Sequence, residues 1–381
     1  MLVSEDSAER RELLDLVFEL TKRSAAFNAS LPKGLAEPLA DFVRSMNCYY
    51  SNKIEGRNTH PVDIERALHS DFDRPGEKRD LQLEAKAHIE VQRWIDEGGL
   101  AANESTISGV CEIHQRFVDL LPEDLRWVQN PDTGERIRLE PGALRTRDVQ
   151  VGRHVAISPG AVPRFLRRFE ACYSRLRPFE AILATAAAHH RLLYIHPFAD
   201  GNGRVTRLMS YATLRRSLET GGLWSVARGL ARKEAEYKGH LASCDQLRRG
   251  DRDGRGLLSH VALANFTRFF LEICLDQTAF MRDLMQPGRL RDRILAWATE
   301  EVGYGRLPDQ AIRVLDAILF RGSLPKSEVV SVIGQSERTA RLVTNALSRE
   351  GIIAAEGVRG EWRLAFPARL APRITPGLYP E

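Results

Sequence analysis

Residues 178–214 read PFEAILATAAAHHRLLYIHPFADGNGRVTRLMSYATL, the most informative stretch of the chain. Pro178 is suited to the first turn of a helix, and the apolar residues after it predict that this helix runs to about Ile195. Pro197 disfavours helical geometry at the residue before it, so the chain should leave the helix at His196. The stretch therefore predicts a helix followed by a sharp change of direction.

A second helix should begin near Gly203, because apolar residues recur beyond it at helical spacing. This stripe consists of Val205, Leu208, Met209 and Ala212. The two predicted helices are joined by a short polar loop, so the segment reads as helix–loop–helix.

The loop between the predicted helices is Asp200-Gly-Asn-Gly-Arg204. Its glycines can take positive φ, and successive backbone N–H groups in such a turn form a concave anion site. The following helix adds free amides and the positive end of its dipole. Arg204 and Arg207, at i and i+3, can point the same way and bind phosphate oxygens bidentately. A lone G-N-G is typical of an ordinary turn. The combination predicts a polyphosphate site.

Two further side chains of the loop supply chemistry. His196, beside the phosphate site, is a natural general base for a hydroxyl nucleophile, since its ordinary pKa is about 6.5. Asp200 is a hard oxygen ligand that suits Mg²⁺. The chain contains no G-x-x-x-x-G-K-[ST] loop, and no predicted strand precedes the glycines, which excludes a P-loop and a dinucleotide fingerprint.

These residues closely resemble the signature of the Fic family, H-x-F-x-[DE]-G-N-G-R-x-x-R. The fixed positions are His196, Phe198, Asp200, Gly201, Asn202, Gly203, Arg204 and Arg207. The resemblance implies that the histidine deprotonates a Ser, Thr or Tyr hydroxyl of a protein. The hydroxyl then attacks the α-phosphate of ATP, and pyrophosphate leaves.

The resemblance also assigns a role to each residue of the loop. His196 is the catalytic base, Phe198 anchors the loop in the core, and Asp200 carries Mg²⁺. The ATP-binding residues are Gly201, Asn202 and Gly203 at the α- and β-phosphates, Arg204 and Arg207 at the β- and γ-phosphates, Val205 and Thr206 between them, and Tyr237 beside the adenine. For Tyr237 the alternative interpretation is a half-buried helix tyrosine.

Pro141-Gly-Ala-Leu-Arg145 resembles the P-G-x-x-R segment of the family, which precedes a β-hairpin called the flap. The flap aligns the target by strand addition. Alternation around a glycine in Asp148-Val-Gln-Val-Gly-Arg-His-Val predicts a short hairpin here, within about 148–160.

A second motif lies ahead of the catalytic segment. Ser51 and Glu55 are at i and i+4, so they share a helix face, and Gly56 would end that helix. Ser-x-x-x-Glu-Gly alone is typical of a solvated helix end. Beside a complete loop it resembles the inhibitory motif of the family, in which Glu55 pairs with Arg207 and withholds it from the γ-phosphate of ATP.

The expected fold class is mainly α, with a Fic-type helical core, a short flap and a C-terminal winged helix-turn-helix. The expected domains are 1–103 with the inhibitory motif, 104–284 as the catalytic core, and 289–381. Within the last, residues 308–366 read as three helices and a hairpin. The third helix would carry Arg338, Arg341 and Asn345 outward and Ala340, Val343 and Leu347 inward, with Arg359 and Arg363 in or near the wing.

The formal net charge of +4 over 381 residues permits nucleotide or nucleic-acid binding without requiring either. Five scattered cysteines, no signal peptide and no apolar run of membrane-spanning length favour a reduced, cytoplasmic protein. The expected partners are ATP, Mg²⁺ and a protein substrate, which can be the chain itself. DNA through the winged helix and a homodimer remain open, and no membrane partner is expected.

Three functions remain in competition at this point. The first is a protein adenylyltransferase. The second is a DNA-binding regulator whose core senses nucleotide, although a sensor would not require the base His196. The third is another reaction on the same fold: kinase-like phosphate transfer, phosphocholine transfer, or removal of AMP.

Overall fold

The computed structural model of the chain describes residues 3–5, 7–32, 34–129, 134–152, 154–218, 222–251, 253, 256–355, 357 and 360–380. These residues form helices and only short antiparallel strands. They fall into two compact units. One contains residues 1–25, 47–220 and 225–277, and the other contains 26–46, 221–224 and 278–381. The division into domains at 103 and 284 stays a prediction.

The first unit is built mainly from helices. They are α3 (Pro61–Leu68), α4 (Glu77–Asp96), α5 (Ile107–Asp119), α6 (Val162–Tyr173), α7 (Pro178–Ile195), α8 (Asn202–Leu218), α9 (Val226–Arg232) and α10 (Glu234–Cys244). Helices α1 (Glu9–Ser30), α2 (Ala36–Ile54) and α11 (His260–Leu284) contribute residues to both units. No helix in the described part of the chain is long and apolar enough to cross a membrane.

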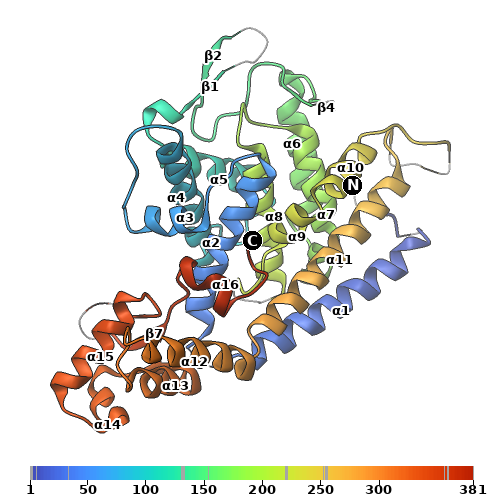
Figure 1. Cartoon of the computed structure of the whole chain (residues 1–381). Helices are drawn as coiled ribbons and strands as arrows, with labels where there is room; N and C mark the ends of the chain where they lie inside the picture. Colours follow the sequence, from blue (N-terminus) through green and yellow to red (C-terminus); the bar gives the residue numbers. More distant parts are fainter. Residues whose placement is uncertain are drawn as a thin grey trace. The chain divides into compact units, whose positions relative to one another are not determined.

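Helices α7 and α8 are the centre of the first unit. They pack against each other, α8 also contacts α4 and α5, and α6 covers α7 (Figure 1). The apolar stripe expected on the second helix of the pair is buried: Val205, Leu208, Met209 and Ala212 are 0–4% exposed. The sequence-based boundaries were close, since α7 ends at Ile195 as expected and α8 begins one residue before Gly203.

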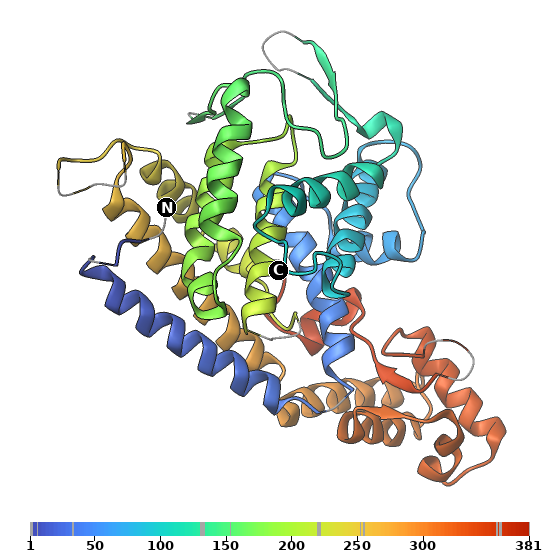
Figure 2. The same ribbon diagram turned by 180° about the vertical axis from the view of Figure 1, so that it is seen from behind.

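Two hairpins lie between α5 and α6. Strands β1 (Trp127–Gln129) and β2 (Arg136–Arg138) form one, which extends beyond the helices in both views (Figures 1 and 2). Strands β3 (Gln150–Val151) and β4 (His154–Val155) form the other. The short hairpin expected within 148–160 is thereby confirmed, and we call residues 148–157 the flap.

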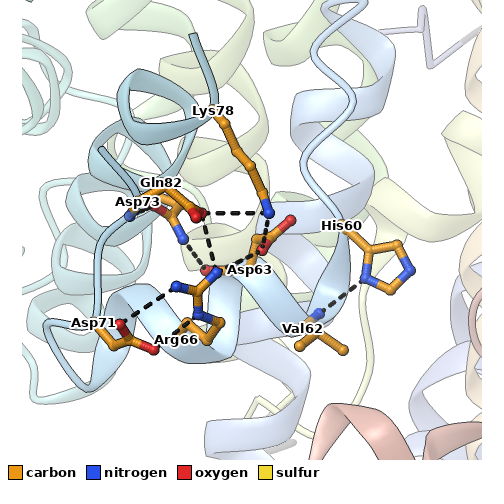
Figure 3. Close-up of polar contacts among 8 residues, drawn as sticks. All are labelled: His60, Val62, Asp63, Arg66, Asp71, Asp73, Lys78 and Gln82. Carbon is orange, nitrogen blue, oxygen red and sulfur yellow. Dashed lines mark hydrogen bonds and ion pairs between the residues drawn. The ribbon is translucent and has the colours of Figure 1, made fainter. Parts of the chain in front are cut away.

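A polar network fixes the turn between α3 and α4 (Figure 3). Arg66 of α3 contacts the carboxylates of Asp63, Asp71 and Asp73. Lys78, at the start of α4, lies 2.9 Å from Asp63 and 3.3 Å from Asp73. The buried side chain of Gln82 accepts a hydrogen bond from the Asp73 backbone N–H at 2.9 Å. These contacts hold the first turns of α4 in place beside α8.

The C-terminal part of the second unit is a small helical module. Its elements are α12 (Pro287–Gly303), α13 (Ala311–Arg321), β5 (Ser323–Leu324), α14 (Val329–Ile333), α15 (Glu337–Arg349), β6 (Ile353–Ala354), β7 (Trp362–Leu364) and α16 (Ala371–Ile374). The three strands form an antiparallel sheet in the order β5-β7-β6.

Helix α15 presents the faces that its sequence predicts. Ala340, Val343 and Leu347 are buried, whereas Arg338, Arg341 and Asn345 are exposed. Arg363, on β7, forms an ion pair with Glu37 of α2, within the same unit. Arg359 lies outside the described residues.

Candidate active site

The candidate catalytic loop, residues 196–204, begins where α7 ends. His196 caps the helix with φ 52° and ψ 62°, a left-handed conformation that is uncommon for a residue other than glycine. Its backbone N–H still bonds the Leu192 carbonyl at 2.9 Å. The reversal expected from Pro197 therefore takes place at His196, and it turns the imidazole out of the helical path.

Asn202 braces the loop from inside. Its Oδ1 accepts a hydrogen bond from the Phe198 N–H and its Nδ2 donates to the Phe198 carbonyl, both at 2.9 Å. Phe198 is fully buried, and its ring stacks on His114 with centroids 4.0 Å apart. His114 Nδ1 accepts a hydrogen bond from the Gly142 N–H at 3.0 Å. Because the side chain of Asn202 is used internally, any phosphate contact at this position falls to its backbone N–H.

The imidazole of His196 is in the form that a general base requires. Its Nδ1 lies 3.4 Å from the carbonyl of Leu193, and this contact favours the tautomer with the proton on Nδ1 and a free lone pair on Nε2. Burial lowers the pKa of His196 to about 4. The ring is therefore neutral near pH 7.

The N-terminus of α8 faces the same loop. Gly201 has φ 79°, and α8 begins at the next residue, so the first backbone N–H groups of α8 have no partner within the helix. A Cβ atom on Gly203 would lie 2.2 Å from Oε1 of Glu55. A carboxylate thus already rests against the anion-binding end of this helix.

Arg207 is held by the last turn of α2. Its Nε donates to Ser51 Oγ at 2.8 Å, and its Nη2 lies 3.2 Å from the Ser51 carbonyl and 2.6 Å from Glu55 Oε1. Gly56 takes φ 74° just after this helix ends. Burial on its own would raise the pKa of Glu55, but the guanidinium of Arg207 holds it below its usual range. The structure therefore brings together the residues of the expected inhibitory motif.

Arg204 contacts a different helix. Its Nη2 lies 2.9 Å from Glu84 Oε2 of α4, and its guanidinium stacks over the ring of Phe117. Arg57 approaches the other oxygen of Glu84 at 3.5 Å. In this structure, the two motif arginines contact carboxylates on separate helices. That Arg204 and Arg207 bind the same polyphosphate stays a prediction.

Both arginines nevertheless lie near the same point of α4. His88, one turn beyond Glu84, is fully buried, and neither of its ring nitrogens has a hydrogen-bond partner in the described structure. Burial lowers its pKa to about 3, and the charges of Arg204 and Arg207 both act in the same direction. A neutral ring therefore lies within electrostatic reach of both guanidinium groups.

The family comparison rests on this same segment. Residues 104–214 match the Fic/DOC family. The chain carries a Fic domain. It is 31% identical over 214 residues to a protein named Protein adenylyltransferase Fic from Nematostella vectensis, and 27% identical over 218 residues to one of the same name from Drosophila grimshawi. These alignments cover 54% and 57% of this chain but only 45% and 39% of the relatives, so the chain spans less than half of their length.

Solved structures support the fold. A Fic family protein from Desulfovibrio desulfuricans aligns with a TM-score of 0.55 at 16% identity, over 96% of this chain and 98% of the other. A Fic domain containing signaling protein from Bacteroides thetaiotaomicron aligns with a TM-score of 0.52 at 18% identity, over 70% of this chain and 95% of the other. The expected helical fold of the Fic type is thereby confirmed.

Arg145 holds the root of the flap of this Fic domain. Its Nε donates to the His196 carbonyl at 2.6 Å, its Nη1 donates to the Arg147 carbonyl at 2.7 Å, and its Nη2 donates to the Ile157 carbonyl. Its backbone N–H bonds the Pro197 carbonyl at 2.8 Å. One side chain therefore joins both ends of the flap to the start of the catalytic loop.

The remaining predicted site residues differ in their surroundings. Asp200 is exposed, and with Gly201 and Arg204 it borders a cavity of about 330 Å³ whose apolar wall includes Phe117. No group of three or more His, Cys, Asp or Glu side chains in the described residues is placed to hold a metal ion. Tyr237 is buried, and its hydroxyl lies 2.7 Å from His189 Nε2, so its role beside an adenine stays a prediction.

Sequence analysis did not identify several residues that contact the candidate site or the flap. Glu84, Arg57 and Asp245 belong to no motif, and their contacts to Arg204, Glu84 and two histidines join segments far apart in the chain. No local pattern points to such contacts.

Proposed function

We propose that this protein is an adenylyltransferase that moves AMP from ATP to a Ser, Thr or Tyr hydroxyl of a protein and releases pyrophosphate. One observation carries the proposal. A neutral histidine, His196, lies at one end of residues 197–201, and the N-terminus of α8, with its free backbone N–H groups, lies at the other. The adenylyltransferase names of the curated relatives support the reaction class.

The reaction needs little more than positioning and charge stabilisation. The target hydroxyl gives its proton to Nε2 of His196 as its oxygen attacks the α-phosphorus. The bond between the α-phosphorus and the oxygen that bridges to the β-phosphate breaks, and pyrophosphate carries those electrons away. The new phosphoester joins AMP to the target.

The phosphates would be held by the first turn of α8. Backbone N–H groups of Gly201, Asn202 and Gly203 would bind the α- and β-phosphates, because they lie at the positive end of the helix. Val205 and Thr206, both buried, complete this turn. Arg204 and Arg207 would bind the β- and γ-phosphates, and Tyr237 would lie beside the adenine.

Asp200 would hold Mg²⁺. A single exposed carboxylate fits this ion, since Mg²⁺ at nucleotide sites is bound by one or two carboxylates, and phosphate oxygens and water supply the other ligands. When bound, the ion would neutralise part of the phosphate charge.

Glu55 would hold the enzyme in an inhibited state. Its carboxylate lies 2.6 Å from Arg207 and rests against Gly203, so it occupies both the arginine and the helix end that a triphosphate would use. ATP would then bind in an unproductive pose until Glu55 moves away. Ser51 supports this arrangement by accepting the Nε hydrogen bond of Arg207 at 2.8 Å.

Labelled ATP tests the reaction. The Glu55→Gly variant is incubated with ATP carrying the label on either the α- or the γ-phosphate, and label bound to protein is counted. AMP transfer attaches the α-label and not the γ-label. Attachment of the γ-label would instead indicate kinase-like transfer. Release of AMP from a target labelled beforehand would indicate removal of AMP, in which water breaks the phosphoester to the target.

The C-terminal module supports a second candidate function. Helix α15 exposes Arg338, Arg341 and Asn345 beside a three-stranded sheet, in the manner of a winged helix-turn-helix. A DNA-binding role would use these residues, whereas Arg363 is paired with Glu37. Retention of the full chain on DNA that weakens with salt, and that fails in Arg338→Ala/Arg341→Ala, would support it. No retention at low salt would instead favour a protein-docking module.

A further inference from the structure

Asp245 joins three elements around the flap. It caps the C-terminus of α10, and its two carboxylate oxygens contact two histidines. Oδ2 lies 2.9 Å from Nδ1 of His154 in strand β4 of the flap. Oδ1 lies 2.8 Å from Nε2 of His190 in α7. One carboxylate therefore connects the flap to the helix that ends at His196.

The other nitrogen of His154 also faces an acceptor. His154 Nε2 lies 3.1 Å from the backbone carbonyl of Tyr194, two residues before His196. A carbonyl and a carboxylate can only accept hydrogen bonds. An imidazole donates from both nitrogens only when it is protonated. The two contacts together are therefore those of a charged imidazolium.

We propose that Asp245 and His154 form a titratable tether that positions the flap over His196, engaged while the imidazole of His154 is charged and released when it becomes neutral. The inference rests on the proposed function, in which the flap aligns the target hydroxyl with His196. Both residues act as positioning residues, because neither reaches the reacting atoms.

The charged groups around His154 decide the direction of its titration. Asp245 on α10 raises the pKa of His154 through its hydrogen bond, while burial and Arg145, at the root of the flap, lower it. Helix α7 contributes Tyr194, the neutral His196 and His190, which lies on the far side of Asp245. The contacts of both histidines lower the pKa of Asp245 to about 2 against the effect of burial. Since the pKa of His154 is raised on balance, the tether is complete below its ordinary value of about 6.5 and is lost as pH rises through the raised value.

The flap thus has one permanent and one titratable anchor. Arg145 holds both ends of the hairpin and keeps its charge at any working pH. The tether at His154 holds the part of the hairpin that follows its turn. A misplacement of about 1 Å at a reacting group can cost roughly 10²-fold in rate, so a shift of the flap would lower the rate of AMP transfer.

The tether is tested in the Glu55→Gly background with α-labelled ATP. Asp245→Asn is compared with Asp251→Asn, which makes the same change at an aspartate fully open to solvent. At pH 6 the Asp245→Asn protein should label at least about fivefold more slowly than the parent, and the gap should close towards pH 9. Asp251→Asn should follow the parent throughout. No deficit, or the same deficit at every pH, would overturn the tether.

A second variant covers the case in which Asp245→Asn fails to fold. Gln at position 154 can hydrogen-bond but cannot titrate, so His154→Gln should match the parent near pH 9 and fall behind it near pH 6. A third measurement is the NMR titration of ¹³C-labelled histidine in the full chain. The pKa of His154 should lie above 6.5 and fall in Asp245→Asn. This titration tests the tether even if the parent takes up no label, an outcome that would refute the proposed function alone.

Discussion

The two motif arginines of α8 are both paired with carboxylates, and the two pairs differ in burial. Arg207 meets Glu55 at 2.6 Å, and Arg204 meets Glu84 at 2.9 Å. The side chain of Glu55 is 36% exposed, whereas those of Glu84 and Arg204 are both 8% exposed. The distances are similar, but only one of the carboxylates is open to water.

Their places in the fold explain the difference. Glu55 is the first residue after the end of α2, where the chain can turn away at Gly56. Glu84 lies in the middle of α4, whose start is fixed by the network around Arg66 (Figure 3). A carboxylate at a solvated helix end can leave its arginine and be hydrated. A buried carboxylate has no water to replace its arginine, so it stays paired. We propose that the Glu55 pair works as a switch and that the Glu84 pair is a permanent brace.

The largest effect should follow from removing the brace. Glu84→Gln leaves the buried Arg204 without its counter-charge, which costs about 3–5 kcal/mol. The melting temperature of the first unit should fall by roughly 6 °C or more, at about 2–4 °C per kcal/mol. The matched control, Glu55→Gln, removes a carboxylate that is 36% exposed, and Arg207, itself 3% exposed, keeps its two acceptors on Ser51, so this variant should be destabilised less than Glu84→Gln. Equal destabilisation by the two variants, measured by thermal unfolding, would contradict the contrast.

The second effect should follow from opening the switch. Glu55→Gly frees Arg207 and the end of α8, and should raise self-labelling with α-labelled ATP by about 5–150-fold, the usual range for a coupling between two sites. Glu84→Gln, assayed at a temperature where it stays folded, should show no such rise. Faster labelling of Glu84→Gln would mean that both ion pairs inhibit the enzyme.

The smallest effect should come from pH, through His196. Burial lowers the pKa of His196 to about 4, so the imidazole stays neutral well below pH 6.5. The transfer activity should therefore be lost only as the pH falls towards about 4. In Glu55→Gly, the acid limb of kcat/KM should therefore lie below about pH 6. A limb at or above about pH 6.5 would show that His196 is solvated in the working enzyme.

Much of this site could be predicted because its signals are local. Pro197 alone implies that α7 stops at the preceding residue, and the structure places that stop in the left-handed turn of His196. The stripe from Val205 predicts the buried face of α8. Ser51 and Glu55 share a helix face by spacing alone, and both reach Arg207. Each inference uses residues within a few positions of one another.

The rest depends on tertiary contacts that no short pattern encodes. Glu84 is 120 residues from Arg204, and Asp245 is 55 residues from His190 and still further from His154. The internal use of the Asn202 side chain was also not foreseen, since an asparagine between glycines reads equally well as a ligand-binding group. Such residues become visible only when packing shows which charges are buried together.

The central claim is that His196 initiates AMP transfer at this loop once Glu55 is removed. The most direct measurement is the rate at which Glu55→Gly and Glu55→Gly/His196→Ala incorporate label from α-labelled ATP, with thermal unfolding to show that both are folded. We expect that the first protein is labelled and that the second is labelled more slowly by about 10²–10⁴-fold. Equal labelling of the two folded proteins would contradict it.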